Sequence, residues 1–190
     1  MSTTSTSVAE RSLEAAVEVF SRYGYQRASM ADVAREAGIS RAALYLHHKD
    51  KPALFRALTE RMVEEALAAA ATAWTAGAPL AENLKAMILA KDLRLFRLLR
   101  ASAHGAELLA ACQEVGRESV CRLDDGFSSL LAERVGAEPG LDLSSFDGPQ
   151  GFGESLASIA GGLKQEMREE AAYLTTVDRL CRIVAKAAQG

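Results

Sequence analysis

The sequence has few of the features that indicate secretion, a membrane span or redox chemistry. Its three cysteines, Cys112, Cys121 and Cys181, show no CxxC spacing, so we interpret them as small buried hydrophobes, with a redox-sensing role as the alternative. No apolar run reaches the roughly 18 residues that a membrane-spanning helix needs. Residues 1–7 lack the basic and apolar regions of a signal peptide, so we expect a flexible tail on a cytoplasmic protein.

Sequence motifs for catalysis are missing as well. There is no HExxH, no GxSxG and no phosphate-binding GxxxxGKS or GxxxxGKT. His47 and His48 are adjacent, so on a helix they diverge by about 100° and cannot chelate one metal ion between them. We therefore expect no enzymatic activity, no metal and no cofactor. A helical enzyme would need clustered titratable groups in the second half of the chain, and the sequence indicates none.

The composition is that of an all-α globular protein. Of the 190 residues, 49% are hydrophobic and 25% are charged, which is typical of a soluble chain that can bury a core. Aromatic residues make up only 6%, while alanine and leucine are abundant. Helical periodicity recurs along the chain and predicts about nine helices.

The first informative segment is a short helical run that begins at Ser29. This residue is a suitable N-cap, and Asp32 follows three residues later as in a capping box. Gly38 can end the run because glycine tolerates the left-handed conformation. The apolar stripe of this helix is Met30, Val33, Ala34 and Ala37.

A second short run follows the turn and covers Arg41–His48. Ser40 is its expected cap, and Leu44 is its one large inward aliphatic side chain. A helix of about two turns is unstable alone, so other elements must hold it. Two short helices around a glycine-containing turn are typical of the helix-turn-helix, whose second helix enters the DNA major groove. Charge agrees, since Arg22–Arg56 contains seven basic residues against three acidic ones.

The remaining helices are predicted from caps and apolar stripes. Ser7 should open a helix that ends near Gly24, and Asp50 should open a long helix that stops by Gly77. Further helices are expected near residues 80–88 and 93–99, then as one continuous run over 106–131, after which a loop covers 138–151. A helix over 152–167 precedes a last one capped by Thr175 or Thr176.

The segment around the turn resembles the TetR (tetracycline-repressor) family of transcriptional regulators over roughly residues 8–58. The matching residues are Asp32-Val33-Ala34, Glu36-Ala37-Gly38-Ile39-Ser40, Leu44-Tyr45, His47, Lys51 and Leu54. The resemblance implies a helix-turn-helix DNA-binding domain at residues 8–52 and a ligand-binding and dimerisation domain at residues 53–190.

The resemblance also implies which residues contact DNA. Arg41, Ala42, Ala43 and Tyr45 match positions that face base edges, and Arg41 is suited to a bidentate contact with guanine. Ser29, His47 and Lys51 match positions that contact phosphates. His48 and Leu46 depart from the pattern, because the family often packs an aromatic or aliphatic residue at the first position and approaches the DNA backbone with the second.

The second domain is expected to form a homodimer and to bind a small-molecule effector. Apolar and small residues surround most of the helix near residue 160, so a partner subunit is the expected cover; the alternative is that they complete the core of one subunit. The interface candidates are Leu156, Ile159, Leu163, Leu180 and Val184. The ligand-binding candidates are Trp74, Phe96 and His104, with packing as the alternative.

The expected function is a ligand-responsive regulator, most simply a repressor that binds a palindromic operator in double-stranded DNA and is released by the effector. The alternative is a helical small-molecule or lipid-binding protein without a DNA role. Phosphate contacts make DNA affinity fall steeply with salt, which would distinguish the two.

Overall fold

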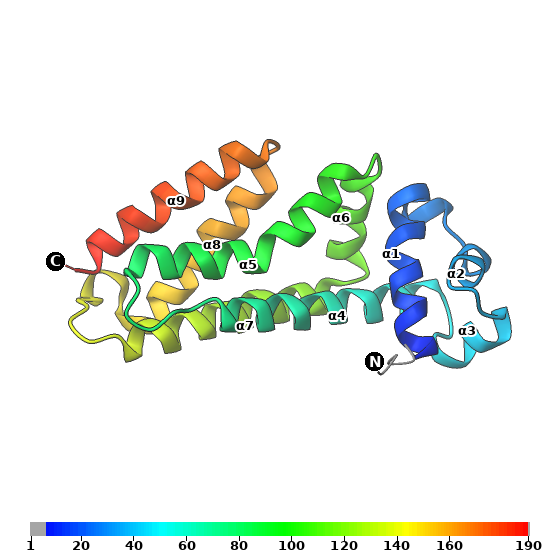
Figure 1. The fold of residues 1–190 in the computed structure, drawn as a ribbon, viewed down its shortest axis with the longest axis horizontal. Coiled ribbons are helices and arrows are strands. Elements are labelled where there is room, and N and C mark those ends of the chain that lie inside the picture. The colour runs from blue at the N-terminus through cyan, green and yellow to red at the C-terminus, as the bar shows by residue number, and fades with distance from the viewer. Residues whose placement is uncertain (1–6, 190) are drawn as a thin grey trace, which may run out of the picture. The chain divides into compact units, whose positions relative to one another are not determined.

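A computed structural model describes residues 7–189 and shows an all-α fold (Figure 1). Within these residues there are nine α-helices, one short 3-10 turn and no strand, as expected from the composition. No helix in this range combines the length and apolar character that a membrane crossing requires. The tail expected at residues 1–7 lies, apart from Ser7, outside the described residues.

The chain divides into two compact units. The first contains the described residues up to Met62 together with Leu98–Val120, and the second contains Val63–Arg97 and the described residues from Cys121 onward. The helices are α1 (Val8–Arg27), α2 (Met30–Glu36), α3 (Arg41–His47), α4 (Lys51–Thr72), α5 (Leu80–Ala101), α6 (Gly105–Glu114), α7 (Arg117–Ala137), η1 (Ser144–Phe146), α8 (Gly148–Glu166) and α9 (Glu170–Ala187). The predicted division at residue 52 remains a functional expectation.

In the first unit, α1 supports the two short helices α2 and α3 (Figure 1). The predicted capping box at Ser7 is confirmed, and so is the break at Gly24, whose φ of 79° interrupts the helical conformation. The core is aromatic at its centre, where Phe55 packs edge-on against Phe20 and Tyr25 with ring centroids 5.5 and 4.8 Å apart. Burial of these rings holds α1 against the start of α4.

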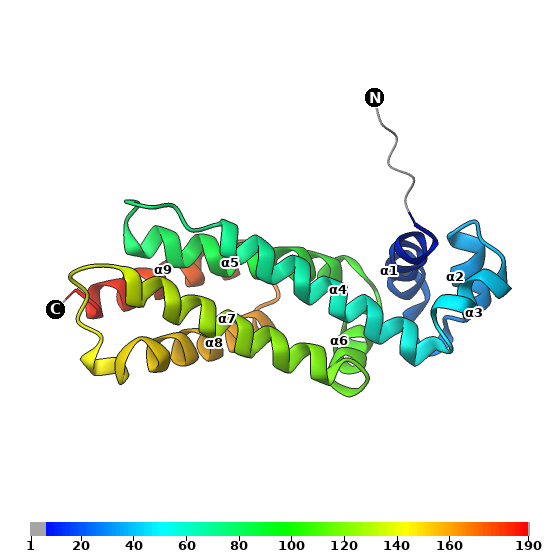
Figure 2. The same ribbon diagram turned by 90° about the horizontal axis from the view of Figure 1, so that it is seen from below.

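In the second unit, α7 and α8 lie side by side (Figure 2). Gly153 on α8 approaches the carbonyl of Ser128 on α7 so closely that no Cβ would fit there. Phe127, Leu131, Phe152 and Leu156 are each at most 1% exposed and form the centre of this apolar core. The small residue at 153 therefore permits the two backbones to pack closely.

Four of the predicted helix boundaries are wrong. The loop expected over 138–151 contains the η1 turn and the first residues of α8, which begins at Gly148. The run expected over 106–131 is two helices, because α6 ends at Glu114 and α7 begins at Arg117. The stretches 80–88 and 93–99 belong to one helix, α5. The last helix begins at Glu170, and Thr175 lies inside it, where its hydroxyl donates to the Ala171 carbonyl at 2.8 Å.

Candidate nucleic-acid interface

The turn between α2 and α3 is built from local hydrogen bonds that the sequence predicts. The backbone N–H of Asp32 donates to Ser29 Oγ at 3.2 Å, and the N–H of Ser29 donates to Asp32 Oδ2 at 3.1 Å. At the other end, Gly38 has a φ of 63° and Ile39 N donates to the Ala34 carbonyl at 3.0 Å. This is a Schellman ending, which requires the left-handed glycine. The N-cap and glycine predictions are both confirmed.

Helix α3 has one buried side chain and one outward face. Ser40 caps it by accepting the N–H of Ala43 at 3.0 Å, and Leu44 is fully buried in the first core. Arg41, Ala42, Tyr45, Leu46 and His47 are all exposed, and Ala43 is half-buried. A single anchor thus fixes the helix while its remaining side chains stay available to a partner.

The ammonium of Lys51 lies on the end of α1. Its Nζ donates to the carbonyls of Tyr25, Ala28 and Gln26 at 2.8, 2.9 and 3.0 Å. Cations stabilise the carbonyl end of a helix, and here each of the three ammonium donors has an acceptor. The contact of Lys51 with phosphate stays a prediction, and it would require one of these bonds to be exchanged.

His48 is buried, and it takes part in the packing of α1 against α3. Its Nε2 lies 3.0 Å from Ser12 Oγ, and its relative exposure is 7%. Burial lowers the pKa of the imidazole, and the neighbouring His47 lowers it further. A polar residue can therefore occupy this position, because Ser12 on α1 provides a hydrogen-bond partner. The sequence did not indicate that Ser12 and His48 would meet.

Comparisons with known proteins agree with this geometry. A family model described as "Bacterial regulatory proteins, tetR family" matches residues 13–58, which contain α2, the turn and α3. Over these residues the chain is similar to the DNA-binding part of the TetR family. The HTH-type transcriptional regulator YvdT of Bacillus subtilis is 36% identical over 58 residues, and the A-factor receptor protein of Streptomyces griseus is 38% identical over 48. The match to YvdT covers 30% of this chain and 30% of YvdT. The match to the receptor covers 25% of this chain and 17% of the receptor.

Solved structures extend the similarity in fold to nearly the whole chain. A protein described as a TetR-family transcriptional regulator from Rhodococcus sp. has a TM-score of 0.72 at 20% identity, over 94% of this chain and 98% of that one. GusR of Salmonella enterica has a TM-score of 0.67 at 19% identity, over 94% and 95%. At these identities the similarity establishes the all-α fold.

The three candidate ligand residues lie in different surroundings. Phe96 is 2% exposed and stacks on Tyr173 with ring centroids 4.9 Å apart, and Trp74 packs half-buried against the same core. His104 belongs to the first unit, where its Nδ1 is 3.4 Å from Glu107 Oε2. Only Trp74 and Phe96 thus share a core, and ligand contact by any of the three stays a prediction.

A buried charged cluster in the second unit was not predicted. Asp92 Oδ1 accepts from the ammonium groups of Lys91 and Lys164, both at 2.8 Å, and Asp92 Oδ2 accepts from the Tyr173 hydroxyl at 2.9 Å. Burial lowers the pKa of Lys91. Burial alone would raise the pKa of Asp92, but the two ammonium groups hold it below its ordinary value. The sequence did contain one indication of this cluster, because Lys91 and Asp92 occupy the same side of α5 as its buried apolar residues.

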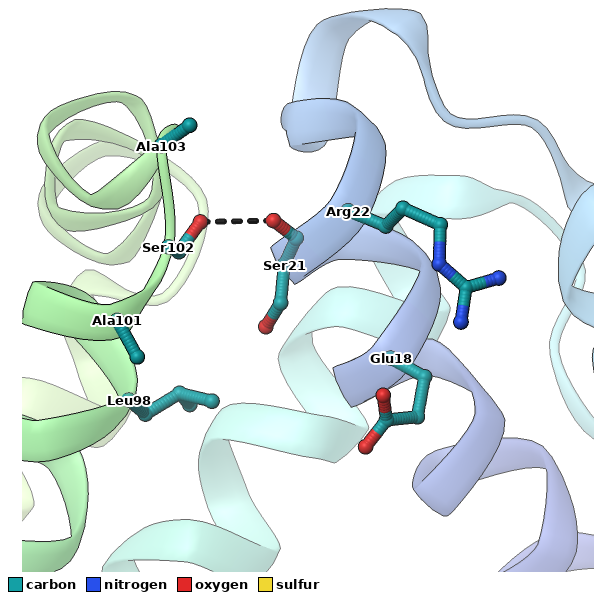
Figure 3. Close-up of a pocket in the computed structure, with 7 residues that line it drawn as sticks. All are labelled: Glu18, Ser21, Arg22, Leu98, Ala101, Ser102 and Ala103. Carbon is teal, nitrogen blue, oxygen red and sulfur yellow. Dashed lines mark hydrogen bonds between the residues drawn. The ribbon is translucent and has the colours of Figure 1, made fainter.

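The first unit also contains an open groove of about 220 Å³, shown in Figure 3. Ser102 Oγ donates to the Ser21 carbonyl across it at 2.7 Å. Its lining is Glu18, Ser21, Arg22, Leu98, Ala101, Ser102 and Ala103. None of the predicted ligand residues lines this groove.

The proposed dimer residues divide into buried and accessible positions. Leu156 and Val184 are 1% and 9% exposed and belong to the core of the second unit. Ile159 is 47% exposed on α8, and Ile183, which was not predicted, is 61% exposed on α9. Leu163 and Leu180 are half-buried. Leu156 and Val184 are therefore not accessible to a partner, but Ile159 and Ile183 leave an exposed apolar surface on these two helices.

Proposed function

We propose that this protein is a cytoplasmic transcriptional regulator of the TetR family, most simply a repressor, that binds a palindromic operator as a homodimer and is released by a small molecule. The observation that carries the proposal is the outward face of α3, which Leu44 anchors while Arg41, Tyr45 and His47 stay exposed. Exposed side chains on a fixed helix are suited to reading base edges, because the major groove is wide enough to admit an α-helix.

Each of the predicted DNA-contacting residues has a proposed role. Arg41 can donate two hydrogen bonds to guanine O6 and N7, while Ala42, Ala43 and Tyr45 face neighbouring bases. Ser29, His47 and Lys51 are the proposed phosphate contacts. The seven basic residues in Arg22–Arg56 provide the positive field that attracts duplex DNA. No enzymatic activity is proposed.

The exposed face of α8 and α9 supports the homodimer. Ile159 and Ile183 are large apolar side chains in water, and Gly162 of α8 has nothing within 4 Å of where its Cβ would lie, so another helix could approach closely. A second copy would cover this surface, and its two-fold symmetry would present two α3 helices to two half-sites. Leu163 and Leu180 lie on the same helices and complete the proposed interface.

Response to a small molecule is proposed for the second unit. Trp74 and Phe96 belong to one apolar core there, which suits an effector with an apolar part. FadR of Bacillus halodurans, which has a TM-score of 0.61, is described as a fatty acid degradation regulator. EbrR, which has a TM-score of 0.60, is described as a multidrug binding protein complexed with imidazole. The effector would favour one of two conformations by its difference in affinity for them.

The test is selection of bound duplexes from random DNA with the purified full chain and with Arg41→Ala. The native protein should select a palindromic consensus, and the variant should lose preference at one symmetric pair of positions. A consensus that the variant leaves unchanged would refute the role of Arg41. Failure to enrich any duplex would instead favour a small-molecule or lipid-binding protein without a DNA role.

A further inference from the structure

Leu46 is the most exposed large apolar side chain in the described part of the chain. It lies in the last turn of α3 with a relative exposure of 86%, against 45% for Tyr45 beside it. Its removal from water would be favourable in proportion to the apolar area covered. A single exposed leucine is ordinary on a protein surface, so its surroundings decide whether it has a function.

The α3 residues one turn before Leu46 are small and apolar. Ala42 and Ala43 precede it by four and three residues, so their methyl groups lie on the same side of the helix. Neither alanine offers a hydrogen bond to a base or a phosphate. The three residues together form an apolar surface with one protruding side chain, between Arg41 in the first turn and His47 in the last.

The major groove of DNA presents one apolar group to such a surface. Guanine, cytosine and adenine present hydrogen-bond donors or acceptors there, whereas thymine adds a 5-methyl group. Phosphates would gain nothing from a leucine, because its side chain carries no donor. We propose that Leu46 reads the 5-methyl group of a thymine in each operator half-site, flanked by the methyl groups of Ala42 and Ala43. This inference rests on the proposed DNA binding by α3.

The experiment uses the operator selected by the full-length protein and changes one methyl group at a time. Each symmetric pair of thymines is replaced by deoxyuridine, which removes only the 5-methyl group. Affinity is measured by fluorescence anisotropy at fixed salt for the native protein, for Leu46→Ala and for Leu46→Met. Circular dichroism checks that both variants remain folded, which is expected because the side chain has almost no contacts to lose.

One thymine pair should respond to deoxyuridine in the native protein, with a loss of about fourfold in affinity for each half-site, the equivalent of one buried methyl group. Leu46→Ala should weaken binding to the native operator and abolish the response at that pair, while Leu46→Met should retain it. Replacement of a cytosine pair by 5-methylcytosine at that position of a mutated operator should restore affinity to the native protein and not to Leu46→Ala.

Two results would overturn the inference while leaving DNA binding intact. Deoxyuridine could have no effect at any pair, or its effect could be equal in the native protein and Leu46→Ala. A uniform loss across unrelated duplexes in Leu46→Ala would assign the side chain to the sugar-phosphate backbone. Absence of any selected operator would be a failure of the proposed function and would be seen before a base analogue is used.

Discussion

At the scale of single residues, Asp92 has the strongest structural role in the second unit. Its carboxylate is fully buried and is the common acceptor for Lys91, Lys164 and Tyr173. Asp92→Asn would leave buried ammonium groups without their counter-charge, so we expect a loss of about 3–5 kcal/mol in the free energy of unfolding, measured in urea. The control is Asp178→Asn, whose solvent-screened ion pairs with Lys85 and Arg182 should contribute far less to stability. Equal effects of the two changes would contradict this account of the cluster.

His48 predicts a pH dependence of stability. Because burial lowers its pKa in the folded state, the unfolded chain binds the proton more readily. Its contribution to folding should therefore be complete above the ordinary histidine value of about 6.5 and should decrease as the pH falls below it. Urea unfolding at about pH 5.5 and about pH 7.5 should show a smaller difference for His48→Gln than for the native protein. His47→Gln, at an exposed position, should keep most of the difference in unfolding free energy between the two pH values. If His47→Gln removes this difference, His48 is not the source of the pH dependence.

The cluster around Asp92 and the burial of the cysteines could not be predicted from the sequence. Lys164 and Tyr173 lie 72 and 81 residues from Asp92, so their convergence depends on the packing of α8 and α9 against α5. The prediction that all three cysteines are buried was wrong, because Cys121 is exposed and Cys112 is only half-buried, while Cys181 is buried. Burial raises the pKa of the Cys181 thiol to about 12.

At the scale of the helices, Lys51 connects the start of α4 to the end of α1. Removal of its ammonium in Lys51→Met leaves the carbonyls of Tyr25, Gln26 and Ala28 without a charged donor. We expect the free energy of unfolding to fall by about 1–3 kcal/mol in the absence of DNA. Lys49→Met changes an exposed neighbour by the same substitution and should leave stability nearly unchanged. If both variants are equally stable, the bonds at Lys51 contribute little to the fold.

The helix-turn-helix was predictable because its signals are local. Ser29, Gly38 and Ser40 each act within four residues, and all three predicted ends are observed. The break between α6 and α7 was not predictable, because apolar periodicity continues through it. A Cβ at Gly116 would lie 3.0 Å from the Thr59 side chain, so a neighbour distant in sequence packs closely against the backbone at the break.

At the scale of the whole molecule, the proposed homodimer depends on the apolar face of α8 and α9. Ile183→Glu places a charge in that face, and because Ile183 is 61% exposed, the protomer should remain folded. We expect the variant to sediment as a monomer and to lose affinity for a two-half-site operator, since each half-site would then be bound alone. Ala171→Glu, at an exposed position of the same helix about 120° away from Ile183 around the axis, is the matched control. A dimeric Ile183→Glu protein would place the interface elsewhere.

The proposed function depends on recognition of a duplex DNA sequence by the outward face of α3. The most direct measurement is the affinity of the full-length protein for its selected duplex and for a scrambled duplex across a range of salt concentrations. Both affinities should fall as salt rises, because phosphate contacts release counterions. The selected duplex should keep an advantage that Arg41→Ala reduces by about 1–3 kcal/mol. Equal affinity for the two duplexes at every salt concentration would contradict the account.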